Sequence, residues 1–589
     1  MILQTLKEYY DRKITDPDGG IAPDGFEYKE IPFVVVLDAV GNVVQIEDTR
    51  TKVGTRSIAR SFLVPQSVKR TGGVKANLFW DNVEYTLGIF DEEKLAAKLL
   101  SVENIEEKER VEENFRKRID EQHSAFIKRI ECFSISSDDG VNAILKFMRN
   151  GQISELQKRE DFLQMKKENP FISFRLNSDP GLLVSNRPSV IAEISQTPSD
   201  GKKGLCLVTG ELDNLCNLHP SIKGIRDANS TGANIVSFNL AAFNSFGKTQ
   251  GKNAPIGEKA VFSYTTALNH LLRRDSSQKI QVGDATTIFW SDKQTPLEGN
   301  FCSLFDEPPK DNPDRLVTSV MDLYSSINTG AAPNESLQAK FFVLGLSPNA
   351  ARISIRFWHA GTIAEFSQRI CQYFTDLTLI HAPYEKDYLS LWRLLRSIAV
   401  QGKMENVPPN LAGDWMRSIL AGTAYPDSLF QAALRRVRSA ESNEKDSYAR
   451  VAIIKAYLNR KTKFHPQQEK EITVSLDKNN RNSGYRLGRL FAALEKIQEN
   501  ASGGNLNATI RDRYYGAASS TPASVFPILM RLKNHHVGKL ERPGEIYFES
   551  LLGEIIGEVN EFPSQFNLYD QGRFAIGYYH QRQEFFLKS

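Results

Sequence analysis

The chain has 589 residues, enough for about four units of domain size. Its 41% apolar, 10% aromatic and 25% charged residues are ordinary for globular proteins, which excludes wholesale disorder. The 74 Lys and Arg residues against 71 Asp and Glu residues leave a formal charge of +3, so a polyanion must be met by local basic patches.

The cysteines and the apolar runs indicate a cytoplasmic protein. The five cysteines have no paired spacing, unlike those of a secreted disulfide framework. The first residues become polar after two apolar ones, so no signal peptide is predicted. The longest apolar runs, residues 33–37 and 525–530, are far shorter than the ~20 residues of a membrane-spanning helix.

The residue patterns, taken in chain order, predict an α+β fold. A first helix ends at residues 16–20, Asp-Pro-Asp-Gly-Gly, and residues 31–37 and 43–46 form a hairpin. Residues 92–131 lack proline and carry charges of both signs, which predicts one or two long solvated helices. Further strands are predicted at residues 184–194, 204–209, 234–238, 286–290, 340–346 and 352–358. Beyond residue 362, spacings of three and four predict helices to the end, as at residues 388–400, 429–437 and 448–458.

Signatures of common enzymes are missing, so we expect a protein that is not an enzyme and holds no cofactor or metal. Gly247-Lys248-Thr249 resembles the end of a phosphate loop, but Ala242 replaces its leading glycine, which favours a polar turn. No histidine forms a His-Glu-x-x-His pair or a His-Asp dyad, and there is no Gly-x-Ser-x-Gly nucleophile motif.

Two weaker sets of residues leave alternatives open. Cys206, Cys216 and His219 offer three zinc ligands, although their spacing favours a buried structural thiol. Asp81, Glu92 and Lys94 imitate an arrangement in which two carboxylates hold magnesium and a lysine polarises a phosphate. A magnesium-dependent nuclease is therefore the alternative function, and a charged helix start is the structural alternative.

A basic run near the amino terminus predicts an anion-binding surface. No acidic residue occurs from Arg50 through Trp80, where seven Lys and Arg residues lie. The run contains a loop with two adjacent glycines, which allow close backbone approach to a ligand. We expect the loop to contact DNA through Lys69, Arg70, Thr71, Gly72, Gly73, Lys75 and Asn77, with the cations on phosphates and the asparagine on a base edge. The alternative is a mobile basic hairpin tip.

Two later segments carry further candidates. Residues 224–257 are rich in Gly, Asn and Ser, with Phe238, Phe243 and Phe246 interspersed, and suit either a binding surface or an irregular connection. Residues 484–498 predict an amphipathic helix whose basic stripe tracks a single strand or faces solvent in a bundle. The predicted contacts there are Arg486, Arg489, Lys496, Arg511 and Arg513.

Eight short, distinct segments are distributed in order from one end of the chain to the other. They are Met1–Gln4, Asp16–Ile21, Lys75–Asn82, Cys206–Glu211, Leu218–Ile225, Gly345–Arg352, Gly484–Phe491 and Gly577–Arg582. None is a catalytic signature. In number and order they resemble the large subunit of the type I-C CRISPR surveillance complex (Cascade).

The resemblance implies a non-catalytic subunit that recognises the protospacer-adjacent motif in double-stranded DNA. It also implies roles in opening the duplex, in stabilising the R-loop and in recruiting a helicase-nuclease, while guide RNA held by the CRISPR backbone subunits reads the target. A small subunit translated internally from the same gene, starting near Val474, is implied as well. The nearby methionines are Met404, Met416 and Met530, so a valine codon would have to serve as the start.

Four segments follow from the patterns and the resemblance together. Residues 1–135 form an α+β part with the basic loop for flank recognition, and residues 136–372 a β-rich mixed region for complex assembly. Residues 373–472 are helical, and residues 473–589 form a helical bundle like a small subunit.

Overall fold

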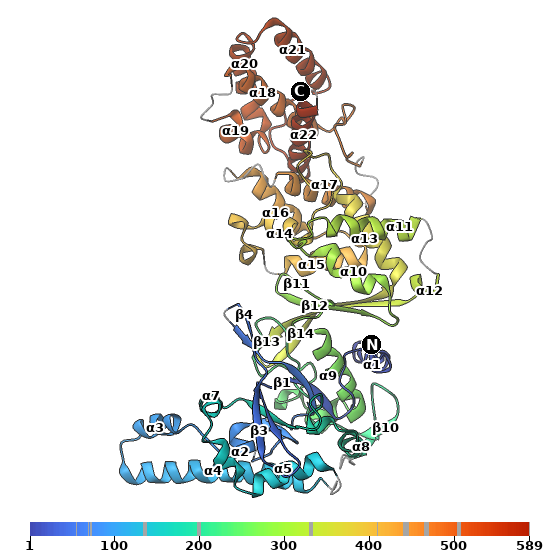
Figure 1. The fold of residues 1–589 in the computed structure, drawn as a ribbon. Coiled ribbons are helices and arrows are strands. Elements are labelled where there is room, and N and C mark those ends of the chain that lie inside the picture. The colour runs from blue at the N-terminus through green and yellow to red at the C-terminus, as the bar shows by residue number, and fades with distance from the viewer. Residues whose placement is uncertain are drawn as a thin grey trace. The chain divides into compact units, whose positions relative to one another are not determined.

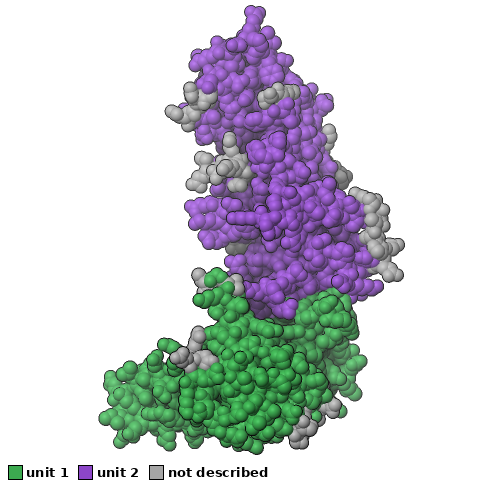
Figure 2. Space-filling view, viewed as in Figure 1, with its two compact units in different colours: residues 1–221, 236–270 green, residues 222–235, 271–589 purple. Residues whose placement is uncertain are grey.

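The computed structural model describes residues 1–54, 56–68, 70, 73–133, 138–196, 202–328, 334–408, 410–439, 447–464, 471–503 and 508–587 (Figure 1). The chain divides into two compact units, which Figure 2 distinguishes by colour. Unit 1 contains Met1–Ser221 and Val236–His270, and unit 2 contains Ile222–Ile235 and Leu271–Ser589. Unit 1 mixes helices and strands and unit 2 ends in helices only, so the predicted α+β fold is confirmed. No described helix is long and apolar enough to cross a membrane.

A four-stranded sheet in the order β3-β2-β8-β7 is the centre of unit 1. Strand β2 (Phe33–Leu37) is buried along its whole length, as its β-branched sequence requires. It pairs antiparallel with β3 (Val43–Asp48), which confirms the predicted hairpin, and parallel with β8 (Phe171–Leu176). The short strand β7 (Trp80–Asn82) pairs with β8 and places the end of the basic run against the core.

Helices cover this sheet and confirm the predicted charged helical segment. Helix α3 (Glu92–Leu100) precedes α4 (Ile105–Glu131), which buries Ile119, Phe126 and Ile130 on one stripe. The other helices of unit 1 are α1 (Ile2–Thr15), α2 (Val83–Leu87), α5 (Asp139–Arg149), α6 (Gln152–Leu156), α7 (Glu160–Glu168), α8 (Pro188–Gln196) and α9 (Glu258–Leu271), whose last residue belongs to unit 2. Short antiparallel pairs join β1 (Phe26–Glu30) with β6 (Ser61–Pro65), β4 (Thr51–Val53) with β5 (Arg56–Ile58), and β9 (Lys203–Leu205) with β10 (Leu212–Asn214).

Unit 2 begins with an antiparallel sheet in the order β11-β12-β13-β14. Its strands are β11 (Lys279–Val282), β12 (Ala285–Ser291), β13 (Lys340–Asn349) and β14 (Arg352–Thr362). The described residues between β12 and β13 form the helices α10 (Pro296–Phe305), α11 (Arg315–Asn328) and α12 (Asn334–Leu337). The three strands predicted at residues 286–290, 340–346 and 352–358 are confirmed.

The other strand predictions between residues 171 and 358 are wrong or too long. Residues 184–194 form a 3-10 turn (Val184–Asn186) and then α8, because Pro188 fixes the backbone angle that a first helical residue needs. Residues 204–209 keep only the end of β9, and residues 234–238 contribute a single bridge from Asn234 to Arg352. Further 3-10 turns lie at Ala241–Phe243 and Gln250–Asn253.

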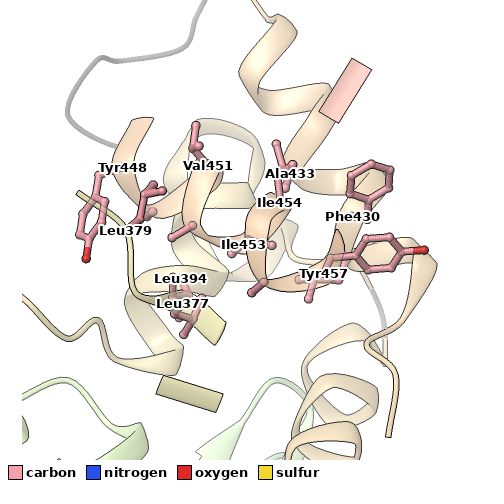
Figure 3. Close-up of a cluster of buried hydrophobic side chains, with 14 of the residues drawn as sticks. Leu377, Leu379, Leu394, Phe430, Ala433, Tyr448, Val451, Ile453, Ile454 and Tyr457 are labelled. Atoms are coloured by element: carbon pink, nitrogen blue, oxygen red, sulfur yellow. The ribbon is translucent and has the colours of Figure 1, made fainter. Parts of the chain in front are cut away.

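The rest of unit 2 is helical, as predicted. Helix α13 (Ile363–Leu377) starts directly after β14, with Thr362 and Glu365 forming a capping box. Figure 3 shows the core around α17 (Ser447–Phe464), which packs against α13, α14 (Leu391–Ile398) and α16 (Asp427–Arg438). The other elements are the 3-10 turns Val400–Gly402 and Met404–Asn406, then α15 (Leu411–Ala421), α18 (Ser483–Ala501), α19 (Ile510–Ala518), α20 (Pro522–Val537), α21 (Arg542–Ile556) and α22 (Leu568–Leu587).

The two units are coarser than the four segments predicted from the sequence. The predicted boundary at residues 135/136 falls outside the described residues. The boundary at residues 372/373 falls inside α13. At residues 472/473 the backbone N–H and C=O of Ile472 both bond to the Asn459 side chain, which joins this point of the chain to α17.

Candidate nucleic-acid interface

The predicted DNA-contacting loop lies in the connection from β6 to β7. Lys69, Thr71 and Gly72 lie outside the described residues. The described part of the loop shows Gly73 with a backbone φ of +70°, and open space surrounds the position of a Cβ atom there. A left-handed turn of this kind favours glycine. The chain therefore turns at Gly73 and returns toward β7.

Asn77 closes the base of this loop from inside. Its side chain is only 4% exposed, and its Oδ1 accepts a hydrogen bond from the backbone N–H of Val68 at 3.0 Å. Its own backbone N–H donates to Oδ2 of Asp81 at 2.9 Å. The expectation that Asn77 points outward to a base edge is corrected, because the side chain is buried and ties the two ends of the loop together.

Arg70 also holds the loop rather than projecting freely from it. Its guanidinium forms an ion pair with Asp81, and its Nε donates to the carbonyl of Lys75 at 2.8 Å. The guanidinium carbon lies 4.0 Å from the centroid of the Tyr85 ring, within the range of a cation–π contact. Asp81 is fully buried, whereas the Arg70 side chain is 33% exposed. Arg70 therefore joins the loop, β7 and α2, and we call this contact set the Arg70–Asp81 clamp.

Lys75 is the described loop cation that faces solvent. Its side chain is exposed, and no described residue forms a hydrogen bond or ion pair with its ammonium group. Elsewhere in the acid-free run, Arg50 is paired with Asp48 and Glu168, two carboxylates from outside the run. Arg50 and Arg70 thus have acidic partners in the folded chain although Arg50–Trp80 contains no acid, whereas Lys75 has none among the described residues.

Sequence reasoning missed Tyr85 and Arg129, which both belong to this site. Tyr85 of α2 lies under the Arg70 guanidinium. Burial lowers the pKa of Arg129 on α4, while the negative charge of Asp81 acts in the opposite direction. Arg129 therefore interacts electrostatically with Asp81, the buried carboxylate of the clamp. An electrostatic interaction across 48 residues of sequence, from Asp81 to Arg129, has no local pattern from which it could be predicted.

The residues of the alternative nuclease each have a different structural partner. Asp81 accepts hydrogen bonds from Arg70 and from the backbone N–H of Asn77. Glu92 lies 3.5 Å from Lys166, and Lys94 donates to the carbonyl of Lys167 at 3.2 Å. Among the described residues, no hydrogen bond or ion pair joins any two of these three side chains, so the geometry gives no support to a magnesium site here.

The zinc alternative gains no support either. Cys206 is buried, and the Cys216 thiol donates to the carbonyl of Leu218 at 3.2 Å. The Nδ1 atom of His219 shares a hydrogen bond of 2.5 Å with the hydroxyl of Tyr264. Within the described ranges, no three His, Cys, Asp or Glu side chains are grouped as metal ligands.

The basic stripe predicted on the carboxyl-terminal helix is largely buried. Arg489 of α18 is 0% exposed and donates to Gln581 of α22 and Glu554 of α21, at 3.1 and 2.7 Å. Arg486 is buried as well and donates to the carbonyl of Ile555 at 3.1 Å, and burial lowers its pKa. The expectation of a solvent-facing stripe is corrected for both arginines, because α18 is covered by α20, α21 and α22.

The other three predicted contacts in this bundle differ in accessibility. Lys496 is partly exposed and lies 3.5 Å from Glu499. The guanidinium carbon of Arg511 lies 5.5 and 5.2 Å from the ring centroids of Tyr515 and Tyr578, and its Nη1 donates to the Tyr578 hydroxyl at 3.2 Å. Arg513 is exposed on α19. Arg513 is therefore the most accessible of the five.

Comparison with known proteins gives one family. The family model described as "CRISPR-associated protein (Cas_Csd1)" matches residues 6–586. The match spans both units and includes the loop between β6 and β7 as well as the bundle from α18 to α22. No curated protein matches the chain.

Proposed function

The chain belongs to the Cas_Csd1 family of CRISPR-associated proteins, and on this premise we propose that it is the non-catalytic large subunit of a type I-C Cascade complex. In this role it recognises the protospacer-adjacent motif in duplex DNA, helps to open the duplex and stabilises the R-loop. Its partners are the guide-RNA-bound backbone subunits, the DNA target and a helicase-nuclease that it recruits. We place it in the cytoplasm, where these partners meet.

The clamped loop between β6 and β7 is the observation that supports this proposal. Sequence-dependent contacts require a reader held in a fixed register on the duplex. The buried contacts of Arg70, Asn77 and Asp81 fix both ends of the loop, while Gly73 and Lys75 face solvent. A fixed base with an accessible basic turn suits the reading of a short flank next to a sequence that guide RNA reads.

Target binding by the reconstituted complex, with and without this chain, tests the proposal. The duplexes share one protospacer and differ only in a randomised three-base flank. We expect enrichment of particular flanks only when the chain is present. The same flank distribution with and without the chain would contradict flank recognition and leave an assembly role.

Replacement of Lys75 by alanine is expected to weaken target binding about fivefold, to a similar degree for every flank. One lost phosphate contact should also reduce the slope of log binding constant against log salt by about 0.9. The matched control is Lys158→Ala, also in unit 1, because Lys158 is 70% exposed and pairs with Glu155. An effect of Lys75→Ala no larger than that of the control would exclude Lys75 as a phosphate contact.

We further propose that a small subunit is translated internally from a start near Val474. Val474 is exposed and lies in the segment that leads into α18, so such a product would contain all of α18 to α22. Untagged expression followed by mass spectrometry should detect a second chain that covers residues 474–589. Its absence, with the full chain present, would contradict this proposal.

We propose that the displaced DNA strand contacts only those of the five predicted side chains of the bundle that are accessible. Arg513 is exposed, and Arg511 is partly exposed with its guanidinium over the buried rings of Tyr515 and Tyr578. Exposed basic groups that follow a phosphate backbone are typical of single-strand binding surfaces. Arg486 and Arg489 are left out because their guanidinium groups serve the helix packing.

A further inference from the structure

The most exposed aromatic side chain among the large apolar residues that the structure describes is Phe246, at 98%. It lies in the loop Leu240–Asn253 of unit 1, which we call the Phe246 loop. Burying a ring of this size is normally favourable, and here the ring stays almost entirely in water.

The Phe246 loop is ordered by its own backbone rather than by packing of the ring. The N–H of Lys248 donates to the carbonyl of Ser245 at 2.9 Å, which closes a tight turn with Phe246 and Gly247 at its centre. Both central residues have positive φ, +50° and +69°, as in a type I′ turn. Few aromatic residues adopt this conformation. The turn therefore places the ring at its tip in a backbone conformation that is unusual for an aromatic residue.

The Asn253 side chain stabilises this turn by bonding to three backbone groups of the loop. Its Nδ2 donates to the carbonyls of Lys248 and Gln250 at 3.2 and 3.0 Å, and its Oδ1 accepts from the N–H of Ser245 at 3.2 Å. A side chain that satisfies three backbone groups makes the loop a preformed element. Preorganisation of this kind reduces the entropy that a ligand must pay on binding.

The charge of the loop indicates the class of ligand. No Asp or Glu occurs between Asp227 and Glu258, while Lys248 and Lys252 are exposed beside the tip. Protein-binding hot spots lie in clusters with an apolar centre, whereas the neighbours of Phe246 at the tip are Asn, Ser, Gly, Lys, Thr and Gln. Leu240 and Phe243 are exposed at the start of the same loop, but at the tip the Phe246 ring stands among polar residues and cations, in a stretch of sequence without carboxylates. This arrangement matches the stacking platforms of single-stranded nucleic-acid binders.

We propose that the Phe246 ring stacks on an unpaired nucleobase while Lys248 and Lys252 contact the adjacent phosphates. The inference rests on the proposed function only in that the ligand is nucleic acid. It names a contact with separated strands, which is distinct from reading the duplex flank by the loop between β6 and β7.

The test uses the full-length chain and a single-stranded oligothymidine that contains one 2-aminopurine. Stacking quenches the fluorescence of 2-aminopurine, so wild type should quench it on binding. Phe246→Asn replaces the ring by a side chain that tolerates positive φ. This variant should abolish the quenching and weaken oligonucleotide binding roughly 5- to 100-fold. Phe246→Trp should keep both. Lys248→Ala with Lys252→Ala should keep the quenching at saturation and reduce the salt slope by about 1.4.

The matched control is Tyr384→Asn, because Tyr384 of unit 2 is 86% exposed and lies outside the Phe246 loop. It should quench as wild type does. Quenching that survives Phe246→Asn would overturn the inference. So would unchanged quenching combined with failure of Phe246→Asn to assemble with the other subunits, since Phe246 would then dock a protein.

The same variants separate this inference from the proposed function. If the chain still confers flank enrichment but Phe246→Asn quenches 2-aminopurine as wild type does, only the stacking role is overturned. If quenching is lost in Phe246→Asn but the chain confers no flank enrichment, only duplex recognition is overturned.

Discussion

Arg70→Ala is expected to abolish flank discrimination and to loosen the strand to which the loop is attached. The substitution leaves the Asp81 carboxylate buried without its guanidinium partner. Breaking a buried pair costs about 3–5 kcal/mol, and the 33% exposure of Arg70 reduces this to roughly 1–3 kcal/mol. Hydrogen exchange of the amides of β7 and α2 should accelerate accordingly, because the clamp joins these elements.

Two further variants distinguish the clamp contacts of Arg70 from the effect of its positive charge alone. Arg70→Lys keeps the positive charge but loses the planar group that lies over Tyr85 and donates to two acceptors, so it should restore little flank discrimination. Arg70→Ala combined with Asp81→Asn should exchange more slowly than Arg70→Ala alone, because no buried charge is left unpaired. If Arg70→Ala behaved like Lys75→Ala, with weaker binding but unchanged exchange, the clamp would be excluded as a positioning device.

The sequence located this loop but misassigned two of its residues for a physical reason. Lys, Arg and Asn in a glycine-rich basic run predict solvent-facing contacts when each residue is judged by its neighbours in sequence. The roles of Arg70 and Asn77 depend instead on Asp81 and Tyr85, which β7 and α2 bring back under the loop. The Lys75 side chain has the predicted exposure because, among the described residues, only its backbone carbonyl is bound, by Arg70.

The fold shows the same division between local and tertiary signals. The hairpin of β2 and β3 and the strands β12 to β14 have strong β-branched and aromatic patterns, and they were predicted. Helix α8 was missed because Val184–Ile194 is apolar enough for either structure, and only Pro188 indicates a helix start. Arg486 and Arg489 were read as exposed because a stripe beside an apolar face normally faces solvent, but α18 is buried on nearly every side.

Two segments that carry the family resemblance contact each other in the bundle, and this contact depends on glycine. Helices α18 and α22 run parallel, since Gly484 lies against Asp570 and Gly488 against Phe574, while Glu499 pairs with Arg582 further along. A Cβ atom at Gly577 would lie 2.0 Å from the carbonyl oxygen of Tyr485, and one at Gly488 would lie 2.1 Å from that of Phe574. These neighbours are backbone atoms, so a side chain cannot rotate away to make room.

Gly577→Ala is therefore expected to destabilise the bundle by about 3 kcal/mol, because the methyl group forces the two helix backbones apart. Amide exchange in α18 and α22 should accelerate, and the 2.8 Å hydrogen bond between the Tyr485 hydroxyl and Nδ1 of His580 should weaken with it. The measurement is hydrogen exchange of the full chain, which resolves the bundle from the rest of a protein too large for two-state unfolding.

Gly553→Ala provides a control of opposite sign. Gly553 lies in α21, and nothing lies within 4 Å of the position of its Cβ atom. Alanine there should stabilise the helix by about 0.5–1 kcal/mol, because the unfolded chain loses conformational freedom and no atom is displaced. If both substitutions slowed exchange, the close approach of α18 and α22 would not depend on Gly577. Faster exchange in Gly577→Ala together with slower exchange in Gly553→Ala would show that backbone contact is the reason for glycine at this crossing. The positions of Arg489 and Glu495 would then also depend on this close approach, since both residues lie on α18 and bond to α22.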